Sequence, residues 1–262
     1  MLFKFKKKKI VVDVFTNSRA AYELFPIQPA IRHVPNWFKK IPSVYKMYHD
    51  DRPDMYDSVG TLKNCPGFIN LYKTGFILPA WCDIQVNTFK NGEIDVLQAS
   101  SHPQRTDSVA HADFQLGAPE NKTFNNLIHT KFHPPWQIHE KTGIRMLMTA
   151  PSWNQYPSMV PNIVPGIVDI KCAMQANINT FWPKISKRYE IEAGTPMLHI
   201  IPLTEDHVEL KTHLVTQDEW VKLGEPAMLR RSFFYNQIQR IDKQKLKNEE
   251  QSKKSKCPFG FK

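Results

Sequence analysis

Short apolar and alternating runs, rather than long periodic ones, dominate the chain. They are separated at short intervals by Pro, Gly and Asn, and they lie at residues 10–15, 127–132, 144–149, 163–170, 189–191, 197–202 and 208–215. Runs of four to eight residues bounded by turn residues are typical of β-strands. Because no helical patterns alternate with these runs, the sequence predicts a mainly β protein, closed into a barrel or stacked as a sandwich.

A β-hairpin is predicted around Asn91 and Gly92. These residues separate the segment FILPAWCDIQVNTF, which follows Gly75, from the segment EIDVLQAS. Asn-Gly between two alternating segments favours a two-residue type I′ turn, because both central residues of that turn need positive φ. The two segments are therefore expected to pair as antiparallel strands.

Prolines divide the segment 22–46, where they occur at positions 26, 29, 35 and 42. Such spacing excludes a long helix and leaves extended chain with at most one helical turn, around residues 36–40. We expect this proline-rich segment to form a strap over the β core.

Helix is expected only near the end of the sequence. Thr216-Gln-Asp-Glu219 is a capping-box pattern, and Pro226 after Glu225 is suited to open a second helix. The apolar side chains of this region recur at helical spacing, so the helix is expected to pack on the β-body; they are Phe233, Phe234, Ile238 and Ile241. The predicted organisation is a basic end (1–9), a single β-rich domain (10–215), a helical segment (216–242) and a Lys-rich tail (243–262).

The composition is that of a folded protein, with 41% hydrophobic and 23% charged residues among 262. No apolar run approaches the roughly 20 residues that cross a bilayer, so we expect no membrane contact and a cytoplasmic location, or association with a virion. The net charge of +10 arises from the two ends, residues 1–9 and 239–262. Residues 10–238 carry 22 basic and 22 acidic side chains and are therefore neutral overall. The two ends would make weak, non-specific contact with polyanions, or serve only for solubility.

Several enzyme classes are excluded by missing motifs. The sequence has no GxSxG elbow, Walker loop or GxGxxG fingerprint, so it is not a serine hydrolase of the elbow type, a kinase, a P-loop ATPase or a Rossmann dehydrogenase. Its four cysteines form no CxxC pair, so buried thiols are expected rather than disulfides or a zinc knuckle. Five histidines lie within 38 residues, although their spacing fits no strong metal template, and they would form either a metal-dependent oxygenase-like centre or ordinary loop positions; they are His102, His111, His129, His133 and His139.

One order of motifs in the second half carries a resemblance. It runs through PPWQIHEKTGI (134–144), APSWN (150–154), PGIVDI (165–170), NIN (177–179) and YEIEAGTPMLHIIP (189–202). This order resembles the deoxyuridine triphosphatase and deoxycytidine triphosphate deaminase superfamily, which implies a β-clip barrel. The chain also resembles a group of phage and bacterial proteins, through PNWFKK (35–40), TLKNCP (61–66) and a strand that ends at Asp83.

The superfamily resemblance implies a set of site residues. Asp169 would orient the attacking water, Ser152 would contact phosphate, and Asp83 would help to hold a metal–triphosphate, which Lys171 would also hold in part. His199 stands where the superfamily has Gln, Cys172 stands where it has an aromatic residue, and Pro-Ser-Trp-Asn replaces its Arg-Ser-Gly-Leu. Loss of that arginine removes a bidentate phosphate contact that the residues present cannot replace.

These residues also have structural alternatives. Gly166 and Gly194 would supply positive φ at turns, Asp169 would accept backbone donors, and Trp136 and Trp153 would lie in the core or at its rim. Cys65 and Cys172 would be packing residues.

The sequence therefore favours a phage-type, β-rich binding or interaction protein that does not turn over a substrate, with nucleotide binding retained or lost. The alternative is a deoxynucleoside triphosphate hydrolase or deaminase with Asp169 as its base and Mg²⁺ as its cofactor; the third candidate is the oxygenase-like protein. No other cofactor and no resident metal are implied. The resemblance implies a homo-oligomer, with a trimer favoured.

Overall fold

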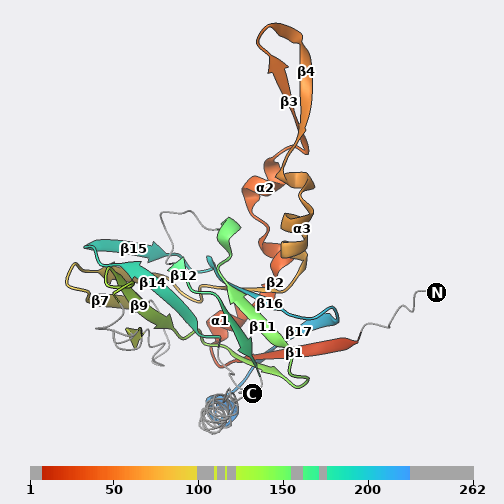
Figure 1. Ribbon diagram of the computed structural model, residues 1–262. Helices are drawn as coiled ribbons and strands as arrows, with labels where there is room; N and C mark the ends of the chain where they lie inside the picture. The colour runs from red at the N-terminus through yellow and green to blue at the C-terminus, as the bar shows by residue number, and fades with distance from the viewer. Residues whose placement is uncertain are drawn as a thin grey trace, which may run out of the picture.

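The computed structural model describes residues 8–98, 109–110, 116, 122–154, 162–170 and 176–224. In this part of the chain, four sheets form a body, and a fifth, two-stranded sheet stands away from it (Figure 1). The prediction of a mainly β protein is confirmed, while closure into a β-clip barrel stays a prediction.

The first sheet joins strands from distant parts of the chain. Its order is β10 (Gln137–Glu140), β1 (Lys9–Thr16) and β17 (His207–Leu214). β1 pairs antiparallel with β10 and, along all eight of its residues, parallel with β17. Helix α1 (Arg19–Glu23) follows β1 and contacts both β1 and β17.

The largest sheet has five strands. Its order is β13 (Gly166–Asp169), β11 (Arg145–Thr149), β16 (Pro196–Pro202), β5 (Phe76–Pro79) and β2 (Gln28–Pro29), and all neighbours are antiparallel.

Two smaller sheets complete the body. One has the order β12 (Asn162–Ile163), β14 (Ile178–Pro183), β9 (Leu127–Phe132) and β8 (Val109–Ala110). The other has the order β15 (Lys187–Ile191), β6 (Ile84–Thr88) and β7 (Ile94–Gln98). One apolar core joins all four body sheets, and its largest fully buried side chains include Trp136, Trp182, Phe132, Met146 and Met197.

A helical neck rises from the body. It consists of residues 30–43 and 61–73, and contains η1 (Ala30–His33), α2 (Asn36–Lys40), η2 (Leu62–Asn64) and α3 (Pro66–Lys73). The neck has a small core of its own, formed by Ala30, Phe38, Phe68 and Tyr72 together with Ile77 of β5.

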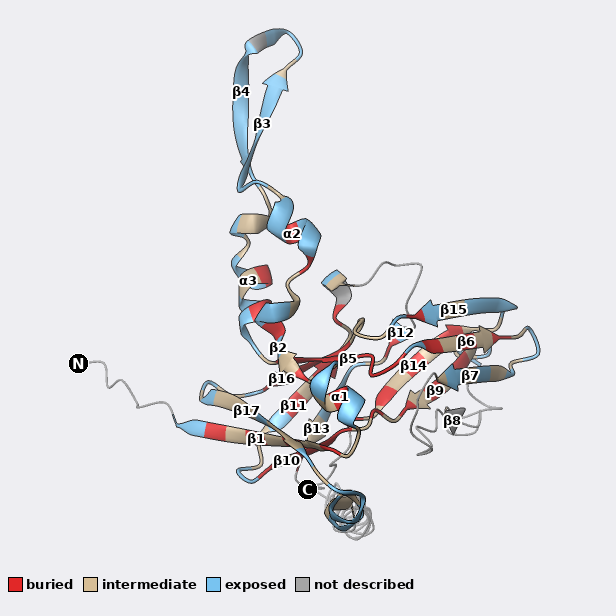
Figure 2. Ribbon diagram, turned by 180° about the vertical axis from the view of Figure 1, so that it is seen from behind, coloured by how far each residue is buried: buried red, intermediate tan, exposed pale blue. Residues whose placement is uncertain are grey.

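The neck carries the two-stranded sheet, which we call the arm (residues 44–60). Strands β3 (Val44–His49) and β4 (Arg52–Gly60) are antiparallel and pair with each other only, in the described part of the chain. The arm projects beyond α2 and α3, away from the body, and its residues are almost all exposed (Figure 2). The proline-rich segment thus starts against the core but ends in the arm, so only its first part covers the body.

Most predicted strands lie where the apolar runs placed them. The run 127–132 coincides with β9, and the single helical turn expected at residues 36–40 is α2. A helix begins at Gln217, and its capping box is formed: Glu219 accepts from the Thr216 amide at 2.8 Å, and Thr216 Oγ1 accepts from the Glu219 amide at 3.3 Å. The helix start at Glu225 and everything after it lie outside the described residues.

The predicted hairpin exists, but the predicted turn type is wrong. β6 pairs with β7, and Phe89 N donates to the Glu93 carbonyl at 3.1 Å. Gly92 has φ +90°, whereas no described non-glycine residue has positive φ, so Asn91 does not adopt the type I′ conformation. The loop instead has three residues and belongs to a common hairpin type. The single loop position that needs positive φ is occupied by Gly92.

The prediction that helix occurs only near the end is wrong. α3 opens with Pro66 at its first turn and buries Phe68 and Tyr72, which lie four residues apart. Proline lacks the amide hydrogen that the first helical turn does not use, so Pro-Gly here starts a helix rather than a turn.

Candidate functional site

The structure separates the residues implied by the superfamily resemblance. Asp169 ends β13 and lies opposite Arg145 of β11, whereas His199 of β16 lies opposite Thr149, at the other end of β11. Four residues of strand correspond to about 13 Å. Asp169 and His199 also lie on opposite sides of β11, so they do not form one site.

The surroundings of His199 indicate a structural role. Its side chain is buried, and Nε2 lies 2.9 Å from the Thr74 carbonyl oxygen. Because a carbonyl only accepts, Nε2 must carry the hydrogen. Burial lowers the pKa of His199, opposed by this hydrogen bond, so the ring is neutral at physiological pH and ties the end of α3 to β16.

Asp83 stabilises a turn of the body through a hydrogen bond. Its Oδ1 accepts from the Ala193 amide at 2.8 Å, beside Gly194, which has φ +85° as the structural alternative expected. Gly166, by contrast, lies in β13 without positive φ, so the same expectation is wrong there. Asp83, Arg188 and Glu190 also line a pocket of about 750 Å³, and Asp169 is not among the residues that line it.

The remaining expected positions are only partly described. Ser152 begins η4 (Ser152–Asn154), although its side chain lies outside the described part, as do Lys171 and Cys172. Trp136 is fully buried and Trp153 is 43% exposed, as core and rim positions respectively. Cys82 is a buried free thiol, and burial followed by the nearby Asp83 raises its pKa to about 11, which makes it a poor nucleophile.

The histidines lie in separate environments where they are described. His129 faces Phe181, His139 packs edge-on against Phe15, and His133 Nδ1 lies 2.8 Å from Asn177 Oδ1. Among the described residues, no group of three His, Cys, Asp or Glu side chains is arranged to hold a metal ion. His102 and His111 lie outside that part of the chain.

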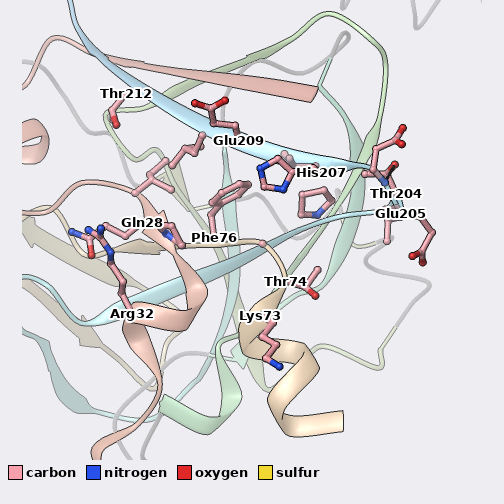
Figure 3. A pocket seen from close by; sticks show the side chains of 18 of the residues that line it. Gln28, Arg32, Lys73, Thr74, Phe76, Thr204, Glu205, His207, Glu209 and Thr212 are labelled. Atoms are coloured by element: carbon pink, nitrogen blue, oxygen red, sulfur yellow. Dashed lines mark hydrogen bonds between the residues drawn. The ribbon is translucent and has the colours of Figure 1, made fainter. Parts of the chain in front are cut away.

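A groove of about 1230 Å³ lies between β17 and the segment that contains β2 and η1 (Figure 3). Arg32 and Lys73 lie on one side of it, and Glu205 and Glu209 lie on the other. A hydrogen bond from Lys9 holds the pKa of Glu209 below its usual range. With charged side chains of both signs along its sides, the groove is suited to binding polar groups.

The neck is attached to the body by polar contacts at Asn154. Its Oδ1 accepts from the Tyr72 hydroxyl at 2.5 Å, and its Nδ2 donates to the His33 carbonyl at 2.6 Å. Trp37 Nε1 donates to the Trp153 carbonyl at 3.2 Å beside them. These bonds join η1, α2 and α3 to η4, which follows β11, so the base of the arm has a defined position.

The neck has a one-sided charge. It contains five basic residues and no Asp or Glu; the five are Arg32, Lys39, Lys40, Lys63 and Lys73. Lys63 Nζ donates to the carbonyls of Phe38 and Lys39, near the end of α2. Burial, followed by the charges of Arg32 and Lys39, lowers the pKa of His33. The neck is therefore a concentrated positive segment within residues 10–238, which carry 22 basic and 22 acidic side chains in total.

The arm exposes apolar side chains on both of its faces. Cross-strand pairing places Tyr45 beside Val59 and Met47 beside Asp57 on one face, with Tyr48 beside Tyr56 on the other. The exposed fractions of the large apolar side chains lie between 43% and 60%; these side chains are Val44, Tyr45, Met47, Tyr48, Met55, Tyr56 and Val59. This exposed apolar surface was not predicted from the sequence, because its apolar residues do not alternate with polar ones.

The two faces of the arm differ in internal cover. On the Tyr48 face, the two tyrosine rings lie 5.6 Å apart, and Lys46 Nζ lies 4.3 Å above the Tyr56 ring. On the opposite face, which we call the Met47 face (Tyr45, Met47, Asp57 and Val59), Asp57 pairs with His49 at 3.3 Å. Among the described residues, no cation and no second ring lies against Tyr45, the aromatic side chain of the Met47 face.

No protein-family model matches the chain, and it matches no curated protein and no solved structure. Within the described residues, no helix has the length and apolar character needed to span a membrane.

Proposed function

We propose that this chain is a binding protein that assembles with protein through its arm and does not turn over a substrate. The observation that carries the proposal is the exposure of seven large apolar side chains on a two-stranded sheet outside the body. An isolated two-stranded sheet is marginally stable in water, and contiguous exposed apolar surface is typical of interaction sites.

The position of two sequence motifs supports the same proposal. PNWFKK (35–40) and TLKNCP (61–66), which carry the resemblance to phage and bacterial proteins, both lie in the neck, on either side of the arm in sequence. A phage-type interaction protein would use the neck to position the arm. Homo-oligomer formation through the arm is part of this proposal.

Nucleotide turnover gains no comparable support. Asp169, Asp83 and His199 each lie in a different part of the body, and two of them make structural hydrogen bonds. A general base must lie within hydrogen-bond reach of the water that it activates, together with the groups that bind the substrate.

The test removes the arm and leaves the neck. Residues 44–60 are replaced by a short Gly-Asn-Gly linker, which is feasible because Ser43 and Thr61 are already joined by a backbone hydrogen bond of 3.0 Å. Light scattering at tens of micromolar should give an oligomer for the full chain and a monomer for the shortened one. The control replaces Leu97, an exposed apolar residue of the body, by Ser. A monomeric full chain, or an unchanged mass after removal of the arm, would overturn the proposal.

A further inference from the structure

The arm and the neck carry opposite charges. The arm has four aspartates against Lys46 and Arg52, and three of the aspartates, Asp50, Asp51 and Asp54, lie at or next to its distal turn. The neck at its base has five basic residues and no acid. Among the described residues, Lys39 and Lys40 form no ion pair with a carboxylate. One end of the projecting unit is therefore negative and the other positive.

We propose that two copies of this chain pack their arms antiparallel, with the acidic tip of each arm on the basic neck of the other. This inference rests on the proposed function, because it names the partner of the arm as a second copy. A two-fold axis through the middle of the contact makes both tip-to-neck contacts equivalent, so one surface satisfies both copies.

The Met47 face is the face that packs. On the Tyr48 face, Lys46 lies above the Tyr56 ring, so a second arm packed there would displace or desolvate this charge, whereas among the described residues no cation lies over a ring on the Met47 face. Met47 lies midway along β3, so an antiparallel arrangement brings it against its counterpart near the two-fold axis. Asp57, the cross-strand partner of Met47, also lies near this axis, and its carboxylate is paired with His49. Tyr45 and Val59, nearer the neck, then face the tip of the other arm.

The dimensions of the arm agree with this arrangement. β3 has six residues, which span about 20 Å at the usual rise of a strand. Because the neck begins directly beyond the base of each arm, an overlap along that length places Asp50 and Asp51 near Lys39 and Lys40 of the second copy. Such exposed pairs set orientation more than affinity, and the apolar face supplies most of the attraction.

Two neighbouring residues give a matched test of the face. Met47 and Tyr48 are each 60% exposed and lie next to each other in β3, but they point to opposite faces. Met47→Ser should weaken the dimer about tenfold or more in sedimentation equilibrium of the full chain, and Tyr48→Ser should change it less than threefold. Equal effects of the two substitutions would overturn the assignment of the face.

Charge exchange tests the orientation. One variant reverses the tip (Asp50→Lys, Asp51→Lys, Asp54→Lys), and another reverses the neck (Lys39→Glu, Lys40→Glu). Each alone should weaken the dimer, because like charges then meet, and an equimolar mixture should restore it, because both contacts again join opposite charges. A mixture that associates no better than either variant alone would overturn the antiparallel arrangement.

The remaining outcomes distinguish failure of this inference from failure of the proposed function. A full chain that is monomeric would overturn the proposed function and the inference together. A trimer that persists in the Met47→Ser variant would overturn the inference and leave an oligomer formed elsewhere. If the full chain is monomeric and binds a fluorescent single-stranded oligonucleotide that the neck-reversed variant does not bind, the neck is a nucleic-acid site and the inference fails.

Discussion

The body and the arm use strand-forming residues in opposite ways. In β1, Ile10, Val12 and Val14 are buried, and the residues between them are partly exposed, as expected for a strand with one face on a core. In β3, neighbouring apolar residues such as Met47 and Tyr48 are both exposed. The comparison teaches that apolar, β-branched and aromatic content favours a strand, whereas only alternation indicates which face is buried.

The largest effect should follow truncation in the body core. Trp182 is fully buried, and its Nε1 donates to the hydroxyls of Thr130 at 2.9 Å and Thr180 at 3.0 Å. Trp182→Ala should lower the free energy of unfolding by about 3–5 kcal/mol, because it leaves a cavity and removes a donor from two buried hydroxyls. Urea unfolding measures this. A loss below about 1 kcal/mol would contradict the view that the body is the stable region.

A backbone constraint at the junction of neck and body should have the next largest effect. Gly75 has φ +79°, and a Cβ there would collide with the Ile200 carbonyl oxygen. Gly75→Ala should therefore cost about 2–3 kcal/mol. Gly166→Ala is the matched control, since a Cβ there meets nothing within 4 Å, and it should change stability by less than about 0.5 kcal/mol. Thermal unfolding compares the two, and similar costs would refute the assignment of strain to Gly75.

A pH-dependent effect should arise from Glu140 at the end of β10. Burial raises its pKa, but hydrogen bonds from Thr142 and from the amides of Gly143 and Ile144 outweigh burial, so the folded pKa is lowered. A carboxyl with a lowered folded pKa stabilises the protein above its unfolded pKa, near 4.3, and loses that contribution as pH falls through the folded value.

Glu140→Gln should therefore cost about 1–2 kcal/mol at pH 7 and progressively less below pH 4. Urea midpoints measured at both pH values decide this. The control is Glu190→Gln, whose carboxylate pairs with Arg188 at the surface, where little change is expected. A difference between wild type and Glu140→Gln that grows at low pH would contradict the sign of the shift.

The smallest effect on stability should come from the arm. Tyr45→Ser should change the free energy of unfolding of the monomer by less than about 0.5 kcal/mol, because the side chain is 55% exposed and contributes to no core. The measurement is made at a concentration low enough to exclude assembly. A cost above about 1.5 kcal/mol would mean that the arm packs against the body, and the contrast between the two regions would disappear.

Local signals in the sequence predicted most strands and the helix that begins at Gln217. Strand β9 and the capping box at Thr216 depend on neighbouring residues, so their patterns contain the needed information. The turn at Gly92 was predicted less well, since one residue of loop length decides between a type I′ turn and a turn with a single positive φ.

The arrangement of the candidate site does not follow from the sequence, for a different reason. The resemblance assigned Asp169 and His199 to one site, but whether they lie close together depends on how β13 and β16 pair with β11, and no local pattern fixes strand order. The neck and arm were missed because Pro66 fits a turn as well as a helix start, and because the apolar residues of β3 do not alternate with polar ones in a way that indicates an exposed strand.

The pairing of β1 with β17 has a consequence for how the protein is made. Lys9 pairs with His207, so about 200 residues separate the two strands in sequence, and at a synthesis rate of about 5–20 residues per second roughly 10–40 s elapse between them. The two strands of the arm are joined by a short turn, and a hairpin forms within about 1–10 μs. The hairpin of the arm can thus form well before the body closes, and under the proposed assembly neighbouring chains on one messenger RNA would meet through their arms while both are still attached to ribosomes.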